Sequence, residues 1–245
     1  MKQGIFTIAE NVALTDSVMR MRLLGDVSDV TAAGQFINIK LSGLYLRRPI
    51  SVYDVDGESV TVIYKVVGRG TEQMKAMKAG ETLDVLTGLG NGYDLTVSGE
   101  KPLLLGGGVG VPPMYLLAKR LIAEGKKVSV ILGFNTKSEI FCEEEFRALG
   151  ADVTVTTADG SYGVKGFVTG PMAEMEYTHF YTCGPEPMLK AIYNTSVTSG
   201  QFSFEERMGC GFGACMGCSC KTITGYKRIC KDGPVMRKEE ILWEK

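Results

Sequence analysis

Residues 208–220 have the sequence Met-Gly-Cys-Gly-Phe-Gly-Ala-Cys-Met-Gly-Cys-Ser-Cys, and a further cysteine follows at position 230 in a short return segment. Cys210, Cys215, Cys218 and Cys230 therefore have the spacing C-x4-C-x2-C with a distant fourth cysteine, which is typical of plant-type 2Fe-2S proteins. Four glycines in this stretch allow the backbone to curl closely around inorganic sulfide. The stretch predicts an iron-sulfur site and one-electron chemistry.

Two alternatives concern the ligands and the metal. Cys220 competes with Cys230 for the fourth position, but it lies only two residues after Cys218 and could share a face with it without reaching a second iron. The plant-type pattern needs a remote fourth ligand and favours Cys230. A zinc site is the alternative to an iron-sulfur cluster, because zinc sites with four cysteine ligands are common. Such sites usually contain two C-x2-C motifs, however, and this chain has one.

Composition limits the class of protein. A chain of 245 residues, 44% of them hydrophobic, can bury two modest cores and carry a small metal-stabilised appendage. A net charge of −1 lacks the excess of positive charge that is typical of nucleic-acid-binding proteins. We find no signal peptide and no apolar stretch approaching the roughly 20 residues of a membrane span, so we expect a cytoplasmic protein without membrane contact.

The distribution of the cysteines and the single histidine also indicates a cytoplasmic protein with a metal site. Five of the seven cysteines crowd between positions 210 and 230, unlike a dispersed disulfide framework, which favours a reducing compartment and metal ligation. The single histidine, His179, lies in an apolar run and is expected to be a strand residue, so His-based triads and His-rich zinc sites are disfavoured.

Short β-type runs dominate up to about residue 98, and turn signals separate many of them. One short helix is predicted between Gly70 and Gly80. These features predict a compact antiparallel barrel. The expected strands are Gly4–Val12, Val18–Leu24, Gln35–Leu41, Ile50–Val55, Ser59–Val67 and Thr82–Leu86.

After Pro102 the rhythm changes to strand, glycine loop, helix and strand, which is typical of a parallel α/β domain. Beyond Gly200 the pattern breaks again, and the last 40 or so residues are expected to depend on a metal site for stability. The predicted fold class is therefore an antiparallel β-barrel, a parallel-sheet α/β domain and a small cluster domain. We place these domains at residues 1–98, 99–204 and 205–245.

Three loops could bind nucleotide cofactors. Gly107–Pro113 reads Gly-Gly-x-Gly-x-x-Pro and opens a helix whose N-terminus could face phosphates, although the same glycines could serve packing alone. Cys183 ends a predicted strand at the ligand-binding edge of the sheet, or it is a small buried hydrophobe. The doubled arginine before Pro49 could hold an anion or simply lie on the surface.

Taken together, Arg48-Pro-Ile-Ser51, Gly70-Thr71, Gly107–Pro113 and Cys183-Gly-Pro185 resemble the ferredoxin-reductase superfamily, in which a flavin barrel precedes a nicotinamide-binding domain. With the cysteine run added, the whole chain resembles the electron-transfer subunits of the NAD-linked, two-subunit (class 1B) dihydroorotate dehydrogenase family. Superfamily members often end in an aromatic residue that shields the flavin, whereas here Trp243 lies beyond the cysteines.

The resemblance implies site residues. The resemblance implies that the segment at Gly70 contacts a phosphate of the cofactor. A helix that begins after Gly70 offers free N–H groups for this contact. In FAD binding, Arg48, Pro49, Ile50 and Ser51 would contact phosphate and ring, Tyr64, Lys65 and Val66 would line the flavin by backbone, and Gly70 and Thr71 would cap the pyrophosphate. In NAD(H) binding, Gly107, Gly108 and Gly110 would cradle the dinucleotide, and Cys183, the candidate catalytic residue, would lie near the nicotinamide.

The resemblance also implies a function in pyrimidine (UMP) biosynthesis. A partner subunit containing FMN would oxidise dihydroorotate, and this chain would pass the electrons through the 2Fe-2S cluster and FAD to NAD+, in a heterotetramer of two copies of each subunit. The alternatives are a related NAD(P)H-linked flavin and iron-sulfur subunit serving ferredoxin or sulfite reduction, and a zinc-stabilised nucleotide-binding module without redox activity.

Overall fold

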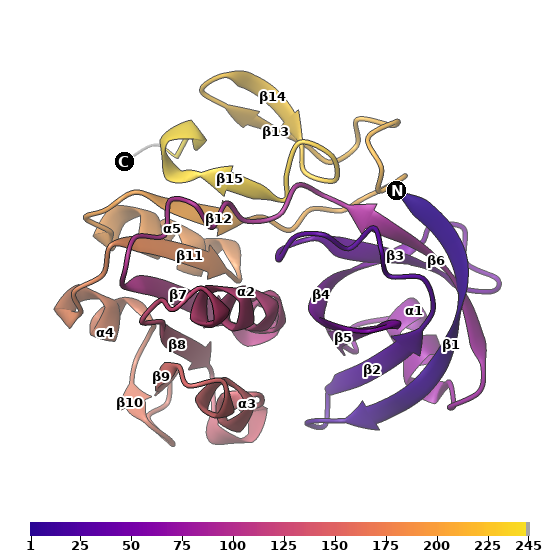
Figure 1. The fold of residues 1–245 in the computed structure, drawn as a ribbon, viewed down its shortest axis with the longest axis horizontal. Helices are drawn as coiled ribbons and strands as arrows, with labels where there is room; N and C mark the ends of the chain where they lie inside the picture. Colours follow the sequence, from indigo (N-terminus) through magenta and orange to yellow (C-terminus); the bar gives the residue numbers. More distant parts are fainter. Residues whose placement is uncertain (244–245) are drawn as a thin grey trace.

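Six antiparallel strands close into a barrel in the first part of the computed structural model, which describes residues 1–243. The strands follow the order β1-β2-β5-β4-β3-β6 around the barrel (Figure 1). A helix, α1 (Arg69–Ala76), connects β5 to β6. The strands are β1 (Lys2–Ala13), β2 (Val18–Leu24), β3 (Phe36–Lys40), β4 (Arg48–Asp56), β5 (Ser59–Lys65) and β6 (Thr82–Leu89).

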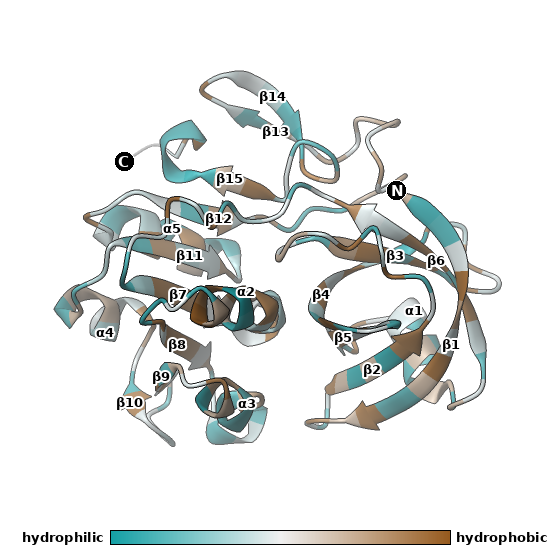
Figure 2. Ribbon diagram, in the orientation of Figure 1, coloured by the Kyte–Doolittle hydropathy of each residue, from teal (hydrophilic) through white to brown (hydrophobic). Residues whose placement is uncertain are grey.

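Alternating polarity explains why these segments form a barrel. On β2, the side chains of Met19, Met21 and Leu23 are buried, whereas Arg20 and Arg22 between them are not. Successive residues of a strand point to opposite faces, so one face fills the barrel and the other meets solvent. Figure 2 shows the alternation as bands along β1 and β2.

A mostly parallel sheet forms the second domain, with the strand order β10-β9-β8-β7-β11-β12-β15. Every residue of the central strand β7 is buried, as expected of a strand covered on both faces. The carboxyl ends of the parallel strands point toward the barrel (Figure 1). The strands are β7 (Pro102–Gly107), β8 (Ser129–Phe134), β9 (Asp152–Thr157), β10 (Val164–Lys165), β11 (His179–Cys183) and β12 (Gly200–Ser203). The helices are α2 (Pro112–Ala123), α3 (Glu143–Ala148), α4 (Thr169–Glu174) and α5 (Glu186–Thr195), with short 3-10 turns η1 (Gly108–Gly110) and η2 (Lys137–Glu139).

The predicted combination of an antiparallel barrel and a parallel α/β domain is confirmed. Elements that the sequence did not reveal are short: β10 has two residues, and β12 has four and begins at a glycine. That glycine, Gly200, lies against the ring of Phe180 on the neighbouring strand, where a Cβ would collide. Strand β12 therefore depends on close packing with β11 rather than on a local pattern.

The C-terminal segment lies across both domains (Figure 1). It contains the hairpin β13 (Ser219–Thr222) and β14 (Gly225–Arg228), the strand β15 (Val235–Arg237) and the 3-10 turn η3 (Lys238–Glu240). Strand β15 pairs antiparallel with β12 and so extends the sheet of the second domain. The predicted cluster domain includes positions 244 and 245, which lie outside the described residues.

The expectation that this segment depends on metal for its stability was incomplete. Ile229, Met236 and Ile241 are buried in one continuous core with Leu89 of the barrel and Phe202 of the sheet. The apolar side chains of the segment are therefore buried in a core that it shares with the two domains on which it lies.

Within residues 1–243, none of the helices combines the length and apolar composition that crossing a membrane requires.

Candidate functional site

Four thiols gather in two pairs beside the barrel. The Sγ of Cys210 accepts the N–H groups of Ala214 at 3.2 Å and Cys215 at 3.4 Å, and the Cys215 Sγ accepts the Cys210 N–H at 3.4 Å. In the second pair, the Cys218 Sγ accepts the N–H of Cys230 at 3.4 Å. Backbone donors aimed at sulfur stabilise thiolates, so the donor set suits a cluster with two irons.

The protonation of these thiols depends on their neighbours. Burial opposes ionisation of Cys210, but the N–H groups of Phe212, Cys215 and Ala214 lower its pKa below the usual range. Burial and the neighbouring Cys218 raise the pKa of Cys230, with a smaller contribution from Cys210. The influence of both cysteines on Cys230 is consistent with four sulfurs in one locality.

Cys220 lies apart from these pairs. Its Sγ contacts the Sδ of Met236 at 3.9 Å, on the side of the shared core, and burial raises its pKa. Among the residues that the structure describes, no three Cys, His, Asp or Glu side chains converge as the ligands of one metal ion do. The other four thiols, in two pairs, supply the two cysteine ligands per iron that a 2Fe-2S cluster takes.

Glycines let the cysteine loop close tightly. A Cβ at Gly209 would lie 3.1 Å from the Sγ of Cys215, and one at Gly217 would lie 3.5 Å from the same sulfur. Gly213 has φ of 93°, and a Cβ there would strike the side chain of Lys231. This tight closure is what the sequence pattern predicted for a loop around a cluster.

The two adjacent arginines have different environments. Arg47 is held by the barrel, because its Nη2 lies 2.9 Å from Oδ1 of Asp84 and its Nη1 donates to the Asp84 carbonyl at 3.0 Å. Arg48 donates to the carbonyl of Leu46 at 2.6 Å, and its guanidinium covers Gly70 at the start of α1, where a Cβ would collide with it. Only Arg48 therefore faces the helix N-terminus at which a phosphate was expected.

The start of α1 is well ordered by Thr71. Its Oγ1 accepts the N–H groups of Val67 at 2.9 Å and Gly68 at 3.2 Å, and it donates to the Gly68 carbonyl at 3.0 Å. The other N–H groups of the first turn remain available, as at any helix start. Arg48, Gly70 and Thr71 are thus brought together, as an anion site requires.

The remaining expected flavin residues lie on β4 and at the end of β5. On β4, Ile50 packs against the barrel core, so Pro49 and Ser51 lie on the outer face of the strand. Tyr64 is buried, its hydroxyl donates to Oδ1 of Asn11 at 3.1 Å, and burial raises its pKa to about 12. Its side chain is therefore engaged within the barrel, and only its backbone could line a flavin. Lys65 ends β5, and the N–H of Val66 donates to the Ser17 carbonyl at 2.7 Å.

The glycine loop between β7 and α2 serves packing at two positions and is open at a third. A Cβ at Gly107 would strike Met188, and one at Gly110 would strike the backbone of Cys183. Gly108 has φ of 52° and nothing within 4 Å of its Cβ position. Packing therefore explains two of the predicted residues, while Gly108 alone faces open space.

Cys183 lies at the carboxyl end of β11, directly between Gly106 of β7 and Ser203 of β12. Burial raises the pKa of its thiol to about 12, although a hydrogen bond with Ser203 opposes the shift. The thiol is thus neutral near pH 7. It can contact a ligand at this edge, but it does not supply a thiolate nucleophile.

Two further residues are placed away from the expected cofactors. His179 begins β11, with Nδ1 3.1 Å from the Ser199 hydroxyl, so it is a strand residue as predicted. Trp243 packs edge-on against Phe202, with ring centroids 5.6 Å apart. It is partly buried and packs against the core that the C-terminal segment shares with the other two domains.

Three residues that the sequence did not single out hold the cysteine segment. Asn38 of β3 donates from Nδ2 to the Cys210 carbonyl at 3.3 Å, and Arg228 donates to the Gly213 carbonyl at 2.8 Å. Asn91, in the linker between the domains, donates to the Val235 carbonyl at 2.8 Å. The only signal for Asn38 was a polar residue inside the apolar run 36–39.

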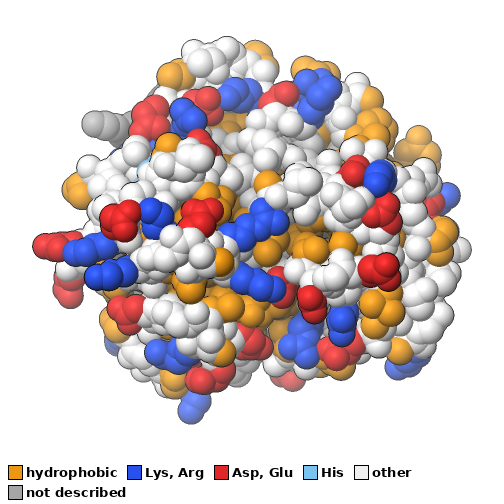
Figure 3. Space-filling view, viewed as in Figure 1, with side chains coloured by type: hydrophobic (Ala, Val, Ile, Leu, Met, Phe, Trp, Pro, Cys, Tyr) orange, Lys and Arg blue, Asp and Glu red, His pale blue; other side chains and the backbone are white. Residues whose placement is uncertain are grey.

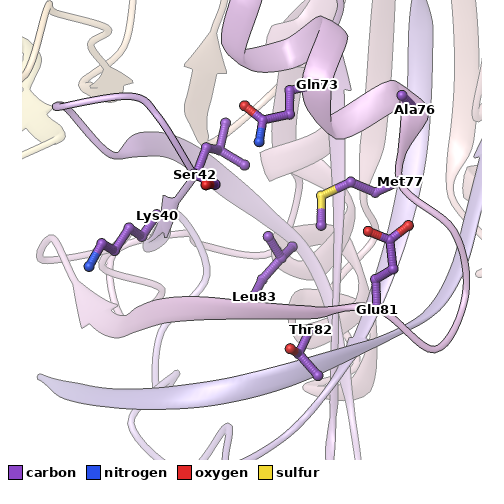
Figure 4. A pocket seen from close by; sticks show the side chains of 9 residues that line it. Lys40, Ser42, Gln73, Ala76, Met77, Glu81, Thr82 and Leu83 are labelled. Carbon is purple, nitrogen blue, oxygen red and sulfur yellow. The ribbon is translucent and has the colours of Figure 1, made fainter.

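The surface of the barrel is hollowed away from these sites. A cavity of about 440 Å³ lies between β3, the end of α1 and the start of β6 (Figure 4). It is lined by Lys40, Leu41, Ser42, Gln73, Ala76, Met77, Glu81, Thr82 and Leu83, none of which was expected to bind a cofactor. On the face seen in Figure 3, hydrophobic side chains line the strip between the barrel and the α/β domain, with Lys and Arg side chains beside them.

Two family descriptions match the chain. Residues 205–242 match the iron-sulfur cluster binding domain of dihydroorotate dehydrogenase B, and residues 104–194 match the oxidoreductase NAD-binding domain. The first match covers all the cysteines of the candidate cluster, and the second covers the glycine loop and Cys183.

Relatives match over nearly the full length. The dihydroorotate dehydrogenase B (NAD(+)) electron transfer subunit of Bacillus pumilus is 44% identical over 255 residues, covering 98% of each chain. The subunit of the same name from Fusobacterium nucleatum is 43% identical over 251 residues, covering 96% of each chain.

Solved structures are similar as well. An NADH-dependent reduced ferredoxin-NADP oxidoreductase, described in a study of flavin-based electron bifurcation, has a TM-score of 0.88 and 30% identity and covers 98% of this chain and 90% of its own. A ferredoxin NADP+ reductase from Neisseria gonorrhoeae, solved with FAD and NADP, has a TM-score of 0.70 at 17% identity, with 80% and 90% covered. The second likeness concerns the fold alone.

Proposed function

This chain belongs to the electron transfer subunits of dihydroorotate dehydrogenase B, and we propose from that membership that it carries electrons from a dihydroorotate-oxidising partner to NAD+ in pyrimidine biosynthesis. The observation that carries the proposal is the pairing of four thiols beside a barrel and a nicotinamide-type sheet within one chain. A location in the cytoplasm and domains at 1–98, 99–204 and 205–245 are parts of the same proposal.

We propose Cys210, Cys215, Cys218 and Cys230 as the ligands of the 2Fe-2S cluster. The two thiol pairs and the backbone N–H groups directed at them support this assignment. When bound, the cluster carries single electrons, FAD exchanges both single electrons and hydride, and NAD(H) carries hydride. The protein's part is to hold these groups at short distance and to exclude water.

We propose that FAD binds along β4 and at the start of α1. Arg48 and the N–H groups beside Gly70 and Thr71 would neutralise the pyrophosphate, because a helix N-terminus and a guanidinium both favour an anion. Pro49, Ile50 and Ser51, with the backbone of Tyr64, Lys65 and Val66, would support the ring. The position of Arg48 over Gly70 supports the phosphate role.

We propose that NAD(H) binds at the carboxyl edge of the parallel sheet, where ligands of such sheets bind. The open position of Gly108 supports an approach of the dinucleotide to the start of α2, with Gly107 and Gly110 shaping the loop. Cys183, neutral at this edge, would contact the nicotinamide without ionising. The names of the relatives favour NAD+ over NADP+ as the acceptor.

We propose an FMN-containing catalytic subunit as the partner, in a heterotetramer of two copies of each chain. Dihydroorotate would be oxidised on this partner. Apolar side chains near the cysteines support docking at the cysteine loop and hairpin: Phe212 is 43% exposed, Met216 53% and Tyr226 72%.

The test of the function is reconstitution. The purified chain with its native partner should reduce NAD+ when dihydroorotate is added, faster than it reduces NADP+, and the isolated chain should show flavin and iron-sulfur absorption. Reconstitution with a ferredoxin but not with the dihydroorotate-oxidising subunit would instead favour the second candidate, a ferredoxin-linked reductase subunit, which the likeness to the NADH-dependent reductase supports. A colourless protein that contains zinc would rule out both.

Arg48→Ala is expected to weaken FAD retention. A hydrogen bond to a charged group contributes about 1.5–3 kcal/mol, so its loss should raise the Kd for FAD roughly 10- to 100-fold. Flavin content after gel filtration measures the effect. Arg47→Ala is the matched control, because it should lower the stability of the barrel through the lost Asp84 pair while retaining FAD. Equal flavin loss in both variants would count against the phosphate role of Arg48.

A further inference from the structure

Asn38 is a buried amide on the outer face of the barrel. Its side chain is 1% exposed, although it lies between Ile37 and Ile39, which point into the barrel core. Because successive strand residues alternate, Asn38 shares the opposite face with Phe36, which belongs to the core beneath the cysteine segment. The amide therefore lies at the junction between the barrel and the proposed cluster.

On one side, Asn38 holds the cysteine loop. Its Nδ2 donates to the carbonyl of Cys210 at 3.3 Å, and a Cβ on Gly211 would collide with the same amide. A carbonyl can only accept, so the nitrogen must face Cys210 and the amide orientation is fixed.

On the other side, Asn38 adjoins the proposed flavin platform. It lies directly opposite Pro49 in the β3–β4 pairing, as Phe36 lies opposite Ser51. Opposite residues of antiparallel strands have Cβ atoms about 4.5–5.5 Å apart on the same face of the sheet. The Nη1 of Arg47 also donates to the Asn38 carbonyl at 3.3 Å, which ties the residue to the same strand pair.

The amide oxygen of Asn38 is a hydrogen-bond acceptor without a donor within the described part of the chain. This atom, Oδ1, is buried. A buried polar group without a hydrogen-bond partner lowers the stability of the fold, so its presence calls for an explanation. The location of the residue can provide one. For Asn38 that location is between the cysteine loop and the outer face of β4.

We propose that Asn38 is a positioning residue that fixes the Cys210 end of the cluster loop against the flavin platform and so sets the environment of the cluster. The inference rests on the proposed function, because it takes Cys210 as a ligand and Pro49 and Ser51 as flavin contacts. Outer-shell groups of this kind orient ligands and tune the metal that they hold.

The test uses the full chain isolated with its cofactors. Asn38→Ala and Asn38→Leu both remove the donor, and the leucine keeps the volume beside the apolar core, which protects folding. Both variants should shift the midpoint potential and the electron paramagnetic resonance line shape of the cluster. The rate at which NADH reduces the cluster should fall by about tenfold or more, the lower end of the range for lost outer-shell partners.

Asn11→Ala is the matched control. Asn11 also lies on a barrel strand and donates to a backbone carbonyl, that of Met74 at 2.8 Å, but at the end of α1 rather than at the cysteine loop. This variant should lose stability with an unchanged cluster spectrum. A wild-type spectrum and potential in both Asn38 variants would overturn the inference, whereas absence of a cluster in the wild-type chain would overturn the proposed function.

A double-mutant cycle gives a second readout. Gly211→Ala alone should broaden or weaken the cluster signal, because the new methyl group meets Asn38 and the residue has φ of 78°. In the Asn38→Ala background the collision with the amide is absent, so the same substitution should cost less signal. Equal losses in both backgrounds would show that the two residues are not coupled, against the inference.

Discussion

Cys230→Ser is expected to abolish the 2Fe-2S cluster while FAD remains bound. Cys230 adjoins the Cys218 thiol, so its replacement removes half of one pair of proposed ligands. Dihydroorotate-dependent NAD+ reduction with the partner should fall more than about 100-fold, beyond the range for losing an outer-shell group alone. Iron content, the electron paramagnetic resonance signal and flavin absorption of the purified variant measure the two cofactors separately.

Cys220→Ser is the control for this variant. The Cys220 sulfur contacts Met236 in the shared core, so the change should cost some stability but leave the cluster signal intact. If Cys230→Ser kept the signal and Cys220→Ser lost it, Cys220 would become the fourth ligand.

Loss of the cluster should not unfold the cysteine segment. Strand β15 pairs with β12, and Asn91 of the linker both donates to Val235 and accepts its N–H at 3.1 Å. Ile229 and Met236 are buried with residues of the other two domains. The apo segment therefore keeps hydrogen bonds and buried apolar surface that do not depend on iron.

The regular parts of the fold could be predicted because their signals are local. The run Val18–Leu24 coincides with β2, since alternation of apolar and polar residues is enough to define a strand. Strand β15 could not be predicted in this way. Its three residues form a strand only because β12 offers a free edge more than 30 positions earlier in the chain.

Sequence spacing could predict the candidate cluster ligands, but it could not predict which other residues lie beside them. Cysteine spacing separates Cys230 from Cys220, and the structure gives the two thiols different neighbours. Adjacent Arg47 and Arg48 look alike in sequence, yet only the contact with Asp84 reveals that Arg47 is held by the barrel. The link from Asn38 to Cys210 joins residues 172 positions apart, so no local pattern could reveal it.

Gly110→Ala is expected to damage the nicotinamide domain more than any other substitution in the glycine loop. The new Cβ would collide with the carbonyl group of Cys183 and the nitrogen of Gly184, and backbone atoms cannot rotate away as a flexible side chain can. Overpacking costs about 1–3 kcal/mol even where side chains can adjust, so a loss near about 3 kcal/mol is expected here. Thermal unfolding measures the loss, and NADH oxidation by the isolated chain should fall with it.

Gly108→Ala separates packing from ligand binding in the same loop. Its Cβ would meet nothing within 4 Å. The free energy of unfolding should therefore fall by about 1–2 kcal/mol, which is the cost of a left-handed backbone conformation for an L-residue. The folded variant should retain FAD and the cluster but show a raised KM for NADH, because the methyl group would project into the space proposed for the dinucleotide. An unchanged KM would place NADH elsewhere on the sheet edge, whereas a loss of stability as large as that of Gly110→Ala would mean that the loop is tightly packed at both positions.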